Sequence, residues 1–94
     1  MVVDEHGRLL NVYKGQPNDQ SFHPWGITHN ILGQVFISDH YNFKIHVLDQ
    51  RGHFARFLYL HYDDLPTGVS CGPDNKLWVV GDFGKVNIFV YRGM

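Results

Sequence analysis

Apolar residues along this chain fall into short runs, each about four to seven residues long and bounded by turn-forming residues. The runs are rich in Val, Ile, Phe, Trp and Tyr, and Gly, Asn, Asp or Pro stands at their boundaries. This pattern is typical of β-strands joined by tight turns. One stretch predicts four consecutive strands, over residues 25–29, 34–38, 44–49 and 53–60. No window sustains an apolar period of 3.6 residues, so we expect little helix.

The same pattern occurs more than once. Residues 24–27 (Pro-Trp-Gly-Ile) recur 42 positions later as residues 66–69 (Pro-Thr-Gly-Val). The offset of 42, shortened to 41 by deletion of one residue, aligns two further pairs of segments: 34–38 with 76–80, and 44–48 with 85–89. A partial third copy opens the chain, where residues 3–9 resemble 48–54. Four short strands in about 40–45 residues are the unit of a β-propeller blade.

Apolar residues stand on both faces of the expected strands. Ile45 and Val47 share one face of their strand, with His46 and Leu48 on the other, and Phe36 opposes Ile37. Such a sheet is suited to lie between two other sheets. We therefore predict an all-β fold, a partial and open β-propeller with a little over two four-stranded antiparallel blades. A single small β-sandwich or meander is the alternative, but it does not predict the repeat.

The repeat divides the chain into an end of one blade (1–14), one full blade (22–60) and a last, three-stranded blade (65–92). Asp49 and Gly52 occupy the first and fourth positions of an expected type I turn. Structural roles are predicted for the residues that recur at turns and strand starts: Pro24, Gly26, Asp39, Asp49, Gly52, Pro66 and Gly68.

Composition narrows the function. The 94 residues carry 8 basic and 9 acidic side chains, a balance without the basic excess typical of nucleic-acid or anionic-membrane binding. No apolar run approaches the roughly 18 residues of a membrane span, and no secretory signal opens the chain. The single cysteine, Cys71, allows no internal disulfide and no cysteine-rich zinc module. We expect a cytoplasmic protein with no membrane partner.

Several of these segments resemble a known family. Residues 24–27, 33–39, 42–49 and 52–54 are similar to an NHL repeat, most of all to the C-terminal repeats of tripartite-motif (TRIM-NHL) proteins of the molluscan and other invertebrate type. The segment 65–89 is similar to the last repeat of those chains. The family usually has Arg before the third-strand Ile, where this chain has Lys44, and its second-strand Asp is Asp39 here but aligns with Gly81 in the next copy. The resemblance therefore implies that any Asp–Arg clamp between those strands is weakened or reshaped.

The resemblance implies a role in partner or substrate recognition for a TRIM-like ubiquitin ligase. The RING and B-box zinc modules of that family are absent from these residues, so we expect no enzyme activity here. NHL propellers have about six blades. We therefore expect a truncated piece of a larger propeller, whose open sheet edges pair with the remaining blades of a longer chain or with another copy.

Seven histidines raise the question of metal binding, but none shows HExxH spacing or a Cys/His ligand set. His29 and Cys71 occupy equivalent positions on the innermost strands, and Cys71 is expected to pack as a small apolar side chain. We predict no metal, no cofactor and no catalytic residue.

Aromatic and polar residues in the expected loops are the candidates for binding, because loops on rigid strands often carry function. The candidate partner-binding loop residues are His40, Tyr41, Asn42, Phe43, Lys44, Asp82, Phe83, His61 and Tyr62. The alternative is that they only cover the edge of the blade and satisfy turn backbone groups. A protein partner is the first prediction. Single-stranded RNA, held by Lys44 with Tyr41 and Phe43, is the second. A fragment of a propeller enzyme of the lyase or lactonase type is the third.

Overall fold

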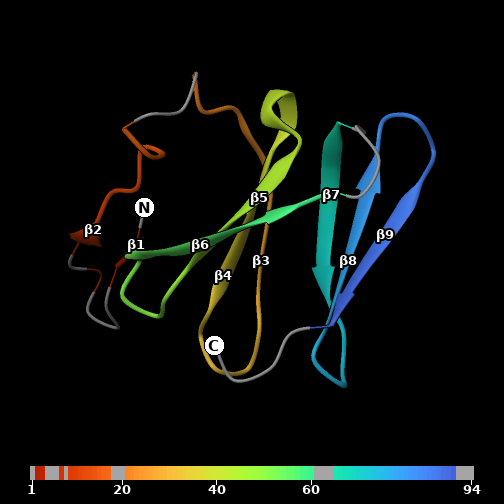
Figure 1. Cartoon of the computed structure of the whole chain (residues 1–94). Coiled ribbons are helices and arrows are strands. Elements are labelled where there is room, and N and C mark those ends of the chain that lie inside the picture. Colours follow the sequence, from red (N-terminus) through yellow and green to blue (C-terminus); the bar gives the residue numbers. More distant parts are fainter. Residues whose placement is uncertain (1, 4–6, 8, 18–20, 61–64, 91–94) are drawn as a thin grey trace.

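The computed structural model describes residues 2–3, 7, 9–17, 21–60 and 65–90 (Figure 1). Nine strands form three antiparallel sheets in the described residues, and each sheet follows chain order. The first sheet holds β1 (Val2–Val3) and β2 (Leu9–Asn11). The second, the four-stranded sheet, holds β3 (Pro24–His29), β4 (Val35–Asp39), β5 (Lys44–Leu48) and β6 (Phe54–Tyr59). The third, the three-stranded sheet, holds β7 (Pro66–Cys71), β8 (Lys76–Gly81) and β9 (Val86–Val90). A short 3₁₀ turn, η1 (His40–Asn42), stands where the sequence predicted a plain loop.

Strand register confirms the repeat, including its one-residue deletion. The pair Thr28–Phe36 across β3 and β4 returns as Ser70–Trp78 across β7 and β8, an offset of 42. The pair Phe36–Val47 across β4 and β5 returns as Trp78–Ile88 across β8 and β9, with the offset of 41 on the third strand. The register also shifts near the start of both β3 and β7. The two sheets are therefore two copies of one unit.

The two larger sheets stack face to face, with β7 in contact with both β3 and β4 (Figure 1). Alternation along each strand sends one set of apolar side chains into the space between them. The fully buried members of this core are Phe36, Ile45, Val47, Leu77 and Val79. Leu58, Val69, Cys71 and Phe89 pack against them. Cys71 is half-buried there, with its backbone N–H donating to Thr28 Oγ1 (3.3 Å).

Gly26 marks a point of close approach between the two sheets. A Cβ atom at this position would lie 2.7 Å from the backbone oxygen of Thr67 on β7. The Gly26 N–H donates to Ser38 Oγ (2.7 Å), and Ser38 Oγ lies 3.4 Å from the same Thr67 oxygen. Any larger residue would push the sheets apart, so the glycine follows from close backbone approach.

The turn between β5 and β6 has the predicted chemistry. Gly52 N–H donates to Asp49 O (2.9 Å), and Gly52 has a φ of 84°, which favours glycine. The Asp49 side chain accepts the backbone N–H groups of His53 and Arg51, each at 2.9 Å. These bonds, that from His53 first, lower the pKa of Asp49 below its usual value of 3.8.

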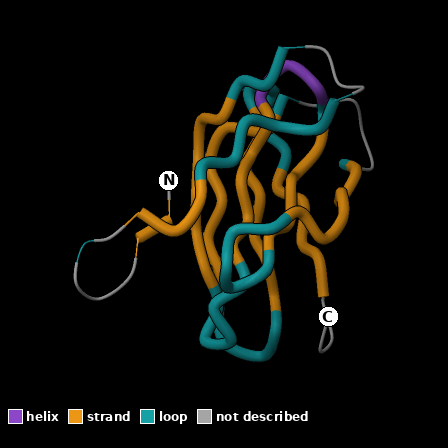
Figure 2. Tube along the Cα trace, turned by 90° about the vertical axis from the view of Figure 1, so that its left-hand side faces the viewer, coloured by secondary structure: helices purple, strands orange, loops and turns teal. Residues whose placement is uncertain are grey.

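The far faces of the two sheets differ. On the four-stranded sheet, Tyr13 lies parallel to Phe54, and Phe22 lies against His46 with 4.5 Å between ring centroids. On the three-stranded sheet, the far face is exposed and carries Trp78, Val80, Val86, Ile88 and Val90. The expectation that both faces are covered therefore holds over β5 and β6 of the four-stranded sheet. It does not hold for the far side of β3, where Ile27 is 69% exposed, or for the three-stranded sheet. Seen from the side in Figure 2, the N-terminal strands project beyond the stack. No helix within the described ranges is long and apolar enough to cross a membrane.

Candidate functional site

The loop between β4 and β5 forms the first half of the candidate site. Its η1 turn ends at Phe43, which has a left-handed backbone with φ of 57°. The His40 N–H donates to the His23 carbonyl (3.0 Å). The Asn42 amide donates to Asp39 Oδ1 (2.8 Å) and to Ser21 O (3.0 Å). The loop is thereby fixed on both sides, to the segment before β3 and to the end of β4.

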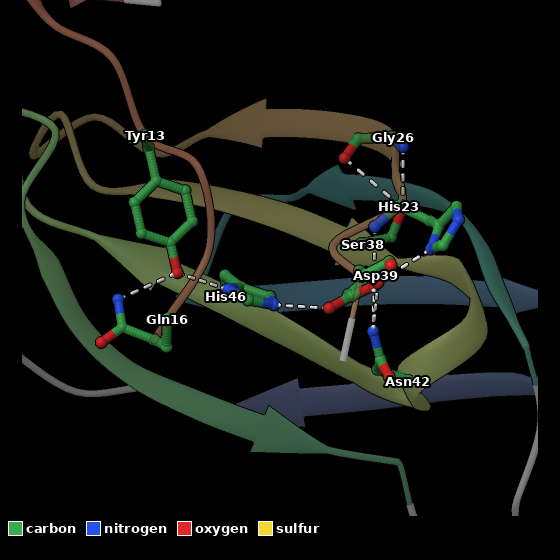
Figure 3. Close-up of polar contacts among 9 residues, drawn as sticks. Tyr13, Gln16, His23, Gly26, Ser38, Asp39, Asn42 and His46 are labelled. Carbon is green, nitrogen blue, oxygen red and sulfur yellow. Dashed lines mark hydrogen bonds and ion pairs between the residues drawn. The ribbon is translucent and has the colours of Figure 1, made fainter. Parts of the chain in front are cut away.

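Asp39 is the buried anchor of this loop. Its Oδ1 accepts the His23 N–H (3.1 Å) as well as the Asn42 amide, and its Oδ2 lies 2.8 Å from His46 Nε2 (Figure 3). Asp39 and His46 both have fully buried side chains. A carboxylate in such a place is tolerated only when its oxygens have partners. Here all three partners come from within the same sheet and its loops.

His46 extends the chain of bonds away from Asp39. The Tyr13 hydroxyl lies at hydrogen-bond distance from His46 Nδ1, and the Gln16 amide donates to that hydroxyl (3.2 Å) (Figure 3). One arrangement of protons satisfies every member: Nε2–H donates to Asp39, and Tyr13 O–H donates to Nδ1. This series of hydrogen bonds holds the segment that contains Tyr13 and Gln16 against the sheet.

The turn between β8 and β9 forms the second half of the site, and one contact ties it to the first. His40 Nε2 lies 2.8 Å from Asp82 Oδ2, which joins the equivalent loops of the two repeats. The Asp82 N–H also donates to Leu65 O (3.0 Å). The His40 ring is buried and stacks flat on Trp25, with 3.9 Å between centroids and 1° between planes. Both loops are therefore held in one place at one end of the two sheets.

Exposed aromatic side chains surround this contact. Tyr41 is 54% exposed, Phe83 66% and Trp25 61%, and Phe43 is 40% exposed. The Tyr41 ring meets the His40 ring edge-on at 4.5 Å. We call these four residues the aromatic rim: Trp25, Tyr41, Phe43 and Phe83. Large apolar side chains that remain exposed on rigidly held loops are suited to act as anchors for a partner.

Other predicted loop residues have different positions. His40 is buried below the rim, and the Asn42 amide is committed to backbone and carboxylate acceptors. Lys44 was expected on the loop surface, but it is only 9% exposed and its Nζ lies 3.8 Å from the centroid of the Phe57 ring. This cation–π contact places the Lys44 ammonium over a ring of the adjacent strand, β6. His61 and Tyr62 lie outside the described residues.

Two residues were missed from sequence. Trp25 stands on the rim where the repeat has Thr67, and an aromatic residue at that strand start was the available signal. His46 takes the role at Asp39 that the resemblance assigned to an Arg at position 44. Because Ile37 pairs with His46 and Asp39 with Lys44, His46 is the diagonal neighbour of Asp39 on one face.

A cavity lies at the end of the two sheets opposite to the aromatic rim. This cavity of about 320 Å³ is formed by the β3–β4 and β7–β8 turns. It is lined by His29, Asn30, Ile31, Cys71, Gly72, Pro73, Asp74 and Asn75. His29 and Cys71, the equivalent positions of the two repeats, thus meet at one cavity. Among the residues that the structure describes, no three His, Cys, Asp or Glu side chains are grouped to hold a metal ion.

Comparison with solved structures decides the fold. The structure of streptogramin B lyase, a β-propeller, is similar to 81% of this chain with a TM-score of 0.51 and 18% sequence identity. The chain is a partial β-propeller. Its two stacked sheets are blades, and the matched part of the chain spans 28% of the length of that protein's chain. No protein-family model and no curated protein matches the chain. The NHL type of the propeller therefore stays a prediction from the resembling segments.

Proposed function

We propose that this propeller fragment is a non-catalytic protein-binding module, and that the aromatic rim is its contact surface. The observation that carries the proposal is the 2.8 Å contact between His40 Nε2 and Asp82 Oδ2. It fixes two loops from different blades while leaving Trp25, Tyr41 and Phe83 each more than half exposed. Loops that are already ordered lose little conformational entropy when a partner binds.

The proposal extends to the kind of protein in which such a module works. The segments that resemble NHL repeats support recognition of a partner or ubiquitylation substrate by a TRIM-like ligase of which this piece is the binding end. Single-stranded RNA binding has less support. Lys44, the cation expected beside Tyr41 and Phe43, is buried over Phe57 instead.

Site-specific photo-crosslinking tests the proposal. A benzoyl-phenylalanine is placed at Phe83 on the rim of the full chain, and in a matched control at Ile31, fully exposed at the opposite end. Irradiation in cells is expected to give a defined protein adduct from position 83 and none of that mass from position 31. The adduct is expected to weaken at least about tenfold when Tyr41→Ala is added, because anchor residues dominate such contacts.

Other outcomes contradict the proposal in different ways. An adduct from position 31 alone would place binding at the cavity end of the sheets and not at the rim. RNA in place of protein at position 83 would support the second candidate ligand. Absence of any adduct at position 83 would show that the rim is a solvated edge.

A further inference from the structure

The far face of the three-stranded sheet is apolar and open. We call it the outer face: Gly68, Ser70, Trp78, Val80, Val86 and Ile88, which the register places side by side across β7, β8 and β9. Trp78 is 42% exposed, Val86 55% and Ile88 51%. A contiguous apolar patch of this kind indicates an interaction surface, whereas single exposed apolar residues are normal.

The other blade shows what such a face accepts. The repeat counterparts of Trp78, Val86 and Ile88 are Phe36, Ile45 and Val47. All three counterparts have no exposed area, because β7 and its neighbours cover them. The same face of the same unit is therefore buried in one copy and open in the other.

Two polar and backbone details point to a strand as the missing cover. At Gly26 a Cβ atom would collide with the Thr67 oxygen of β7, whereas at its counterpart Gly68 the nearest atom to such a Cβ is Val80 Cβ at 4.0 Å. The Thr28 hydroxyl accepts the Cys71 N–H from β7, and its counterpart Ser70 is exposed. Gly68 and Ser70 thus retain the two features that contact β7 in the other blade, a glycine without a Cβ and a hydroxyl acceptor. Neither feature has such a contact among the described residues.

The chain also has a counterpart of β7, the strand β3, and the far side of β3 is exposed. On β7 the residues that enter the interface are Val69 and Cys71, and their counterparts on β3 are Ile27 and His29. Ile27 is 69% exposed, and His29 is also exposed. The Trp25 carbonyl is the counterpart of the Thr67 carbonyl that approaches Gly26.

We propose that a second copy of this chain docks the exposed side of its β3 on the outer face of β7–β9. The contact repeats the interface between the two blades, with Ile27 against Trp78 and Val80 and the Trp25 backbone against Gly68. It joins different surfaces of the two copies, so further copies add head to tail into a ring or a filament. This association uses sheet faces, and Trp25, through its backbone, is the one residue that it shares with the aromatic rim.

Light scattering of the full chain during size-exclusion chromatography tests the proposal. The mass of the unmodified chain is expected to rise with concentration between about 1 μM and 1 mM. Gly68→Leu blocks the accepting face and Ile27→Glu blocks the docking strand, and each variant alone is expected to be monomeric. Ala55→Leu, which adds three carbon atoms where Gly68→Leu adds four, does so at an exposed position of β6; it is the control and is expected to associate like the unmodified chain.

Mixing the two blocked variants makes the test specific. Gly68→Leu keeps an intact β3 and Ile27→Glu keeps an intact outer face, so an equimolar mixture is expected to form dimers and nothing larger. A mixture that stays monomeric would overturn the proposal. So would blocked variants that associate like the unmodified chain, or an unmodified chain that stays monomeric at every concentration, which would reserve the outer face for another occupant.

A second measurement does not depend on these variants. In Trp25→Phe the remaining tryptophan is Trp78. Its fluorescence emission is expected to shift to shorter wavelength as concentration rises, because docking removes the indole from water. Circular dichroism of each variant verifies that the strands are retained. An emission maximum independent of concentration, with circular dichroism unchanged, would contradict the docking.

Discussion

The two blades of this protein have the same strands in the same register, yet they differ in what surrounds them. The four-stranded blade is covered on one face by the other blade, and on the second face, over β5 and β6, by Tyr13 and Phe22 of the N-terminal segment. The three-stranded blade is covered on one face alone within the described residues. The comparison teaches that the repeat sets where each side chain lies and which face it occupies. What packs against that face sets how much the side chain contributes to the free energy of unfolding.

The largest expected difference is between Phe36 and its counterpart Trp78. Phe36→Ala is expected to lower the free energy of unfolding by about 3–5 kcal/mol, because a fully buried ring leaves a cavity. Trp78→Ala is expected to cost about 1 kcal/mol, since its ring is 42% exposed. Urea unfolding followed by circular dichroism in dilute solution measures both. Equal losses would show that the two faces are covered alike.

The next contrast has opposite signs at equivalent positions. His46→Val is expected to cost about 3 kcal/mol, because it leaves the buried Asp39 carboxylate without one of its partners. Asn87→Val is expected to raise the free energy of unfolding by about 1 kcal/mol. The Asn87 Nδ2 is buried with no hydrogen-bond partner among the described residues, and valine removes that polar group. Urea midpoints compared with the unmodified chain give both signs. A loss of stability in Asn87→Val would contradict the inference that the Asn87 amide is buried at a cost.

The glycines of the two inner strands give a smaller contrast. Gly26→Ala is expected to cost about 1–3 kcal/mol, because the added Cβ would overlap the Thr67 carbonyl. Gly68→Ala is expected to be neutral or to stabilise by about 0.5 kcal/mol, since alanine is the better strand residue and nothing within 4 Å other than Val80 meets it. Thermal unfolding at low concentration distinguishes the two. A destabilising Gly68→Ala in the monomer would show that the outer face is already covered.

The smallest expected effect is a pH dependence at the turn of the four-stranded blade. The backbone N–H groups of His53 and Arg51 lower the pKa of Asp49 below 3.8, so its contribution is present above that pH and is lost as pH falls through the lowered value. Half-exposure of the side chain limits this contribution to less than about 0.5 kcal/mol. Asp49→Asn is therefore expected to flatten the acid limb of the stability curve slightly. Unfolding midpoints of both chains between about pH 2 and pH 6 measure this, and parallel curves would contradict it.

The features of the fold that depend on local sequence patterns were predicted correctly. The proline–glycine starts at positions 24 and 66, the turn at Asp49 and the one-residue deletion before the third strand all lie where the repeat placed them. The loops containing His40 and Asp82 were both candidates for binding and lie 42 positions apart, and a 2.8 Å contact joins them. Such features depend on residues close in the chain or on a fixed offset.

The chemistry of the site was harder to predict. Lys44 was expected among the binding residues of the loop, beside Tyr41 and Phe43, but Phe57 on the adjacent strand provides a ring face for it. Asp39 was left without a partner once Arg was missing at position 44, although His46 lies diagonally across the same ladder. In both cases the outcome depended on which side chain on a neighbouring strand reaches the group, and that requires coordinates.

The sequence by itself determined the strands, their order and their pairing, because alternation and turn chemistry act over a few residues and the repeat transmits them from one blade to the next. Only the tertiary structure decided which faces are buried and which aromatic residues stand in solvent. Burial belongs to the contact between two surfaces, so identical positions such as 36 and 78 differ in exposure according to what lies against them.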